Sequence, residues 1–160
     1  MGSNGQTQAV LVIPCSGVGK VHGLISREAV YHVADNLLPG QTDTVCLALL
    51  VTGDAETKQK VQETPCITLD GCPKLCAWKN VALSGGKIAK GIRIYDAMKR
   101  HRGATFGTAT ALSEDGWTIV EELAAEVAWL CGAGVSPASH ERSRVNLCDS
   151  AGGTPAPQSR

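Results

Sequence analysis

A unit of apolar strand, glycine-rich loop and amphipathic helix is the feature of this chain that most limits its fold. The run QAVLVIPC over residues 8–15 is apolar after its first residue and ends in a Pro-Cys pair, as expected for a strand buried on both faces. The glycine-rich loop SGVGKVHG follows, and apolar residues then recur at helical spacing over residues 24–38. The chain therefore opens with strand, loop and helix in that order.

The same unit recurs along the chain, with apolar runs separated by polar or glycine-rich segments. Strands are expected over residues 43–51, 66–70 and 92–95, and helices after Gly53, from Cys72 to the pair Gly85 and Gly86, and over residues 115–131. Strands that alternate with helices favour a parallel sheet. We therefore expect an α/β fold, layered, with a mostly parallel sheet and helices on both faces.

Composition divides the chain into a domain and a tail. Residues 136–160 are rich in Ser, Pro, Gly and charge and have no periodicity, which predicts a disordered C-terminal tail. The rest of the 160 residues can bury a core without disulfides, and 43% of the chain is apolar. The sequence thus predicts one α/β domain over residues 8–135, followed by the tail.

Charge and hydropathy argue against several classes of protein. The 15 acidic and 15 basic residues balance, so there is no electrostatic reason to expect nucleic acid as a partner. No segment approaches the roughly eighteen apolar residues of a membrane span. The N-terminus also lacks the basic region of a signal peptide. We therefore expect a cytoplasmic protein that binds neither nucleic acid nor membrane.

Seven cysteines are the strongest chemical signal in the sequence. In a reducing compartment, clustered thiols favour metal binding or thiol chemistry over disulfides. Cys15 follows the first predicted strand, and Cys72 and Cys76 would share one face of a helix that begins at Cys72. Ligands of parallel sheets bind beyond the carboxyl ends of the strands, and a helix start stabilises thiolates. A free cysteine is more often a core residue, which explains Cys131 and could explain Cys46.

The segments PCSGVGK, SREA and DGCPKLC together resemble the DGC-domain family of small prokaryotic proteins, which are proposed to bind zinc. The resemblance extends from about Ala9 to the last helix. It implies a metal site of four cysteines, of which Cys15, Cys72 and Cys76 match the motifs directly. For the fourth ligand the resemblance favours Cys46, and Cys66 is the alternative.

Four thiolates suit a closed tetrahedral Zn²⁺ site, but they also suit an iron–sulfur cluster. The sequence requires no catalytic residues, so we expect a structural or metal-handling protein, with an enzyme as the less favoured reading. The expected partners are the metal ion and a protein that receives metal or sulfur. The alternative is a thiol-redox or iron–sulfur component that uses Cys15, Cys72 and Cys76.

Other polar residues near these motifs are assigned ordinary roles. The four histidines, among them His22, lack metal-ligand spacing and are predicted to be surface or core residues. Arg27 is predicted to be a solvated surface residue. Asp70 is expected to accept hydrogen bonds from backbone N–H groups of the adjoining turn.

Overall fold

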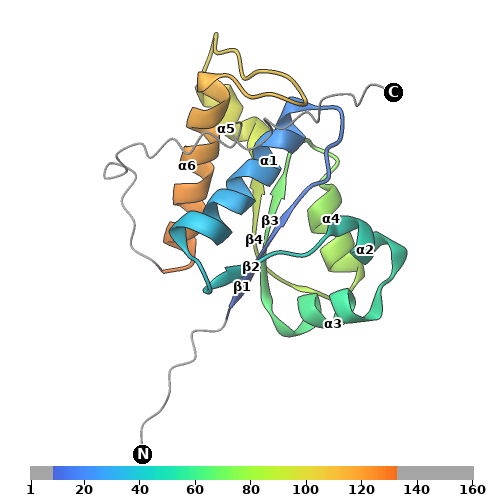
Figure 1. The fold of residues 1–160 in the computed structure, drawn as a ribbon. Coiled ribbons are helices and arrows are strands. Elements are labelled where there is room, and N and C mark those ends of the chain that lie inside the picture. The colour runs from blue at the N-terminus through green and yellow to red at the C-terminus, as the bar shows by residue number, and fades with distance from the viewer. Residues whose placement is uncertain (1–8, 133–160) are drawn as a thin grey trace, which may run out of the picture.

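A four-stranded parallel sheet forms the centre of the protein in a computed structural model that describes residues 9–132 (Figure 1). The strands are β1 (Val10–Pro14), β2 (Thr42–Asp43), β3 (Pro65–Asp70) and β4 (Lys87–Arg93), in the order β2-β1-β3-β4. Every neighbouring pair is parallel. The predicted α/β fold with a parallel sheet is thus confirmed, whereas the predicted tail over residues 136–160 lies outside the described residues.

Helices cover both faces of this sheet (Figure 1). One layer contains α1 (Val21–Tyr31), its π-helical continuation η1 (His32–Leu37), α5 (Ile94–Arg100) and α6 (Glu114–Leu130). The other contains α2 (Leu47–Thr52), α3 (Ala55–Glu63) and α4 (Cys76–Leu83). The strand, glycine loop and helix at the start of the chain are present as predicted.

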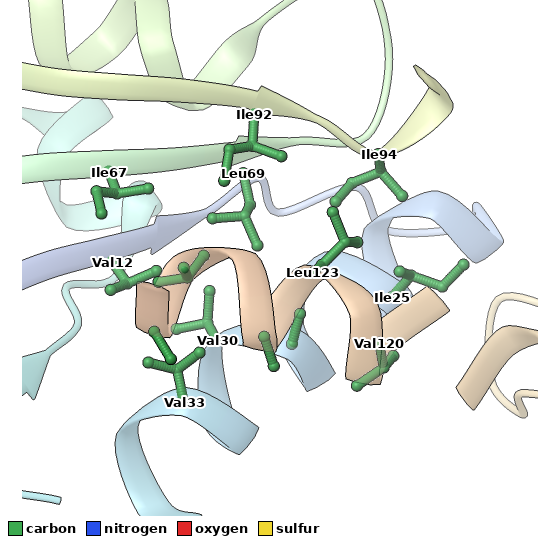
Figure 2. Packing of buried hydrophobic residues seen from close by; sticks show 14 of the residues in the cluster. Val12, Ile25, Val30, Val33, Ile67, Leu69, Ile92, Ile94, Val120 and Leu123 are labelled. Atoms are coloured by element: carbon green, nitrogen blue, oxygen red, sulfur yellow. The ribbon is translucent and has the colours of Figure 1, made fainter. Parts of the chain in front are cut away.

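Alternation along the strands produces two apolar clusters, one on each face of the sheet. Val12 in β1 and Leu69 in β3 face α1 and α6, where Leu123 is among the buried residues that Figure 2 shows. Leu11 and Ile13 point to the opposite face, where they pack with residues of α2, α3 and α4. Because β1 is buried on both sides, it has the continuous apolar sequence that a central parallel strand needs.

The prediction of a strand over residues 43–51 was wrong. Only the first of these residues belongs to β2, and α2 occupies Leu47–Thr52. Leu47 and Leu50, three residues apart, are buried, whereas Leu49 is 49% exposed. One buried stripe at this spacing is the pattern of a surface helix, not of a strand covered on both faces. Cys46 is consequently the N-cap residue of α2 and not a strand residue.

The helix expected to begin at Cys72 begins instead at Cys76, after a turn that contains Pro73. The reason lies in the cap: the carboxylate of Asp70 accepts the first backbone N–H groups of α4. Leu75, with a φ of +54°, reverses the chain just before the helix. Cys72 and Cys76 therefore do not share a helical face, and the helix dipole acts at Cys76.

The fourth strand is also displaced from its predicted position at residues 92–95. β4 covers Lys87–Arg93, and Ile94 already begins α5. Ile94 and Ala97, three residues apart, are both buried, so the chain leaves the sheet in order to bury a helical stripe against α1 and α6.

The strand order places a topological switch between β1 and β3. The chain leaves β1 to form β2 on one side of it and returns to form β3 on the other side. In open α/β sheets the crevice beyond the carboxyl ends of two such strands is where ligands bind. Cys15 follows β1 directly, and Gly71 and Cys72 follow β3, so two of the predicted ligands lie at this switch point.

Candidate metal centre at the carboxyl ends of β1 and β3

Cys15 is fixed at the carboxyl end of β1 by hydrogen bonds that its backbone N–H donates and its sulfur accepts. Its backbone N–H donates to the Leu69 carbonyl at 2.9 Å and to Ser26 Oγ at 3.2 Å. Its Sγ accepts the Gly71 N–H at 3.3 Å, and the residue is only 6% exposed. The thiol therefore has a defined position beside the loop that follows β3.

Two residues of α1 hold the loop that carries Cys15, and neither role was expected from the sequence. Ser26 is fully buried and donates its hydroxyl to the Leu69 carbonyl at 2.7 Å. Arg27, predicted to be solvated, donates from Nη1 to the Ser16 carbonyl at 2.6 Å. A polar Ser26 on the apolar stripe of a predicted helix was the available signal. These contacts explain what the SREA segment does for the PCSG loop.

Gly71 is a residue for which only glycine fits. A Cβ at this position would lie 2.9 Å from His22 Cβ and 3.3 Å from Cys15 Sγ. His22, at the start of α1, is thus a neighbour of the thiol site, although its spacing gave no sign of this. Its Nδ1 is buried without a hydrogen-bond partner in the described part of the chain, and burial followed by the charge of Lys20 lowers its pKa.

Asp70 connects β3 to α4. Its Oδ1 accepts the Ala77 N–H at 2.8 Å and its Oδ2 accepts the Trp78 N–H at 3.0 Å, with the residue 2% exposed. The expectation that Asp70 accepts backbone N–H groups is confirmed, but these groups belong to the helix and not to the turn. Burial raises the pKa of this carboxyl, and the two N–H donors oppose that rise.

Cys72 and Cys76 lie in the turn after β3 and at the first residue of α4. Cys72 is partly exposed and Cys76 is exposed. Burial raises the pKa of Cys15, the Gly71 hydrogen bond opposes this, and negative charge on Asp70, Cys72 and Cys76 raises it further. Cys72 and Cys76 therefore lie in the same region as Cys15, beyond the carboxyl ends of β1 and β3.

The two candidates for the fourth ligand occupy different surroundings. Cys46 is exposed at the N-terminus of α2, and the next residue, Leu47, packs in the same cluster as Cys15 and Ala77. Cys66 is fully buried at the start of β3, and its Sγ donates to the Thr64 carbonyl at 3.2 Å.

Cys66 differs from the other candidate ligands in the pKa of its thiol and in its position along β3. Burial raises the pKa of its thiol to about 11. It precedes Asp70 by four strand residues, about 13 Å along the strand. Cys66 therefore has the surroundings of a core residue.

The cysteine thiols suit a soft or borderline cation, although they do not lie close together in the structure. Thiolates are the ligands that such ions prefer, and a bound cation would offset the burial and the neighbouring negative charge that raise the pKa of Cys15. Within residues 9–132, however, no three His, Cys, Asp or Glu side chains are grouped closely enough to hold a metal ion. The thiols thus suit a metal ion in their chemistry, but in the described residues they do not form a closed ligand set.

Comparison with known proteins identifies one relationship. The sequence model of the DGC domain matches residues 11–123, which include Cys15, Cys46, Cys66, Cys72 and Cys76. No curated protein and no solved structure matches the chain. Among the described residues, no helix has the length and apolar character that crossing a membrane requires.

Proposed function

The chain belongs to the DGC domain family, and from this premise we propose that it binds one metal ion, Zn²⁺, through thiolates at the carboxyl edge of the sheet. Family membership indicates a cysteine-rich protein of metal-binding character. The single observation that carries the proposal is the hydrogen bond from the Gly71 N–H to Cys15 Sγ at 3.3 Å, which holds the Cys15 thiol against the loop that leads to Cys72 and Cys76 at the topological switch point. Thiols that repel each other as anions gain most from a shared cation.

The proposed ligands are Cys15, Cys46, Cys72 and Cys76. Cys46 and Cys76 lie at the N-termini of α2 and α4, so the helix dipoles would stabilise both thiolates. The two helices also pack against each other, which places these N-termini on the same side of the sheet. The turn between Cys72 and Leu75 joins the strand to α4, and it is the segment whose adjustment would close the site. Four thiolates leave no open position, which favours a structural or metal-handling role over hydrolysis.

Exposure of the ligands favours metal handling within this proposal. Cys46 and Cys76 are exposed, and Cys72 is partly exposed. A metal held by exposed thiolates at the surface is accessible to the thiols of a partner protein, to which it can pass by exchange of ligands. The partner would be a protein that receives the metal, and a reducing cytoplasm would keep the thiols available.

Metal analysis of the full chain tests this function. We expect protein purified without oxygen to contain about one zinc per chain, as a four-coordinate site requires, and to be colourless. Iron, labile sulfide and a brown colour would support the alternative, an iron–sulfur component, which the same exposed thiols favour. Absence of any bound metal after reconstitution with zinc in the reduced state would contradict both proposals.

The fourth ligand is tested with a matched pair of cysteine variants. We expect Cys46→Ser to weaken zinc binding about a hundredfold, since one of four ligands contributes roughly 3 kcal/mol of a structural site's binding energy. Cys66→Ala should leave zinc affinity unchanged but lower the free energy of unfolding by about 1 kcal/mol, because it removes a buried sulfur. Competition with a chromophoric chelator measures the affinity and urea unfolding the stability. The opposite pattern would assign Cys66 as the ligand.

A further inference from the structure

A groove between α4 and β4 adjoins the thiol site and is not used by it. Its cavity volume is about 270 Å³, and it opens at the carboxyl ends of β3 and β4. It is lined by Asp70, Leu75, Trp78, Gly91, Ile92 and Arg93. A volume of this size accommodates a small organic molecule of one ring.

Two polar side-chain atoms lie close to Gly91, one of the residues that line this groove. From the position that a Cβ would take at Gly91, Thr68 Oγ1 lies 3.5 Å away and Trp78 Nε1 3.8 Å away. Thr68 is fully buried, and its hydroxyl has no hydrogen-bond partner within residues 9–132. Thr68 is not one of the residues that line the groove, so its hydroxyl lies beneath the groove and is not a contact for a ligand.

The accessible charge of the groove is positive. Arg93 is exposed, and its Nη2 contacts Asp96 at 2.7 Å, which leaves other guanidinium donors for a ligand. Asp70 is 2% exposed, and both of its oxygens already accept backbone N–H groups of α4. A molecule that enters the groove therefore meets the guanidinium of Arg93 and not the buried carboxylate of Asp70.

Trp78 is the aromatic residue that lines the groove. This side chain is 42% exposed, and its Cδ1 lies 3.2 Å from the Cβ position of Gly91, so a larger residue there would displace the ring. Leu75 forms another wall from the left-handed conformation with a φ of +54°. A non-glycine residue in this conformation stores strain, and such residues are concentrated at sites that hold ligands.

We propose that the groove between α4 and β4 binds a small planar carboxylate, with the carboxylate on Arg93 and the ring against Trp78. Arginine recognises carboxylates through paired N–H donors, and an aromatic face gives a planar body a partner for stacking. Because Leu75 lies in the turn between Cys72 and Cys76, the ligand would contact the segment that carries two of the thiols. The proposal does not depend on which metal the thiols bind.

Binding is tested with benzoate, and with benzamide as the neutral analogue of the same shape. The full chain is titrated while the indole N–H resonance of Trp78, assigned by comparison with Trp78→Phe, is followed by NMR. We expect a dissociation constant of roughly 1 mM for benzoate, in keeping with a ligand of this size. Benzamide should bind at least about tenfold more weakly, because it lacks the charge that pairs with Arg93.

Two arginine variants distinguish binding of benzoate at Arg93 from nonspecific attraction of benzoate to the positive charges of the protein. Arg93→Gln should weaken benzoate binding about tenfold or more, whereas Arg100→Gln should leave it unchanged, since Arg100 faces Glu122 on α6. Gly91→Val should abolish binding by filling the groove, with far-ultraviolet circular dichroism as the check on folding. Equal binding of benzoate and benzamide, or an Arg93→Gln variant that binds benzoate like the unmodified chain, would overturn the proposal.

Discussion

Replacement of Cys72 with serine is expected to reduce the zinc content from about one ion per chain to nearly none. Cys72 follows Gly71, whose N–H binds Cys15 Sγ, and it precedes the turn that leads to Cys76. It is therefore the thiol that connects the buried part of the site to the exposed part. Serine keeps the shape of the side chain but is not ionised near neutral pH, so it cannot replace a thiolate ligand.

Metal analysis after dialysis against a chelator measures this loss, and thermal unfolding with and without zinc measures its consequence. Zinc should raise the midpoint of unfolding of the unmodified chain and not that of Cys72→Ser, because only a ligand that binds the folded state stabilises it. Cys131→Ser is the matched control, since Cys131 is a partly buried thiol at the end of α6, on the other helical layer. Retention of a full zinc equivalent by Cys72→Ser would exclude Cys72 from the site.

The fold class could be predicted because the strongest local patterns agree with the final topology. The run before Cys15 is apolar on both faces because β1 lies at the centre of the sheet, between β2 and β3. A helix was expected after Gly53, and the side chain of the next residue, Asp54, accepts the Thr57 N–H at 2.8 Å at the start of α3. Such signals are contained in a few neighbouring residues, so no knowledge of tertiary contacts is needed to interpret them.

The elements that were predicted incorrectly depend on contacts between distant residues. The run LALLV is compatible with a buried strand or a short helix until one knows that only Leu47 and Leu50 face a neighbouring layer. The start of α4 depends on Asp70, which accepts the N–H of Ala77, seven residues further along the chain. The place of His22 beside Gly71 likewise depends on β3 packing against the start of α1.

The prediction with the largest effect on stability concerns Gly23 in the first turn of α1. Gly23→Ala is expected to lower the free energy of unfolding by about 2–3 kcal/mol, the cost of forcing extra volume into a close-packed position. Helix propensity alone gives the opposite sign, since alanine is favoured over glycine by about 1 kcal/mol in a helix. The steric term should exceed this gain, because a Cβ at Gly23 would lie 2.2 Å from the Gly17 carbonyl oxygen.

Backbone contact leaves little room for relaxation at this point. The Cα and carbonyl carbon of Gly17 would each lie 2.5 Å from the new methyl group, so the loop itself would have to move. A Cβ at Gly17 would lie 3.2 Å from Cys15 Sγ, which shows how closely this loop adjoins the thiol. Gly23→Ala should therefore displace Cys15 and also weaken zinc binding, measured by chelator competition on the folded variant.

Gly91→Ala is the control, because the nearest atom to its Cβ is Trp78 Cδ1, at 3.2 Å, in a partly exposed side chain that can move. This variant should change the free energy of unfolding by no more than about 1 kcal/mol, as for most substitutions outside the close-packed core. Urea unfolding of both variants compares the two sites directly. If Gly23→Ala were more stable than the unmodified chain, helix propensity would dominate, and the close contact between Gly17 and Gly23 would not hold Cys15 in place.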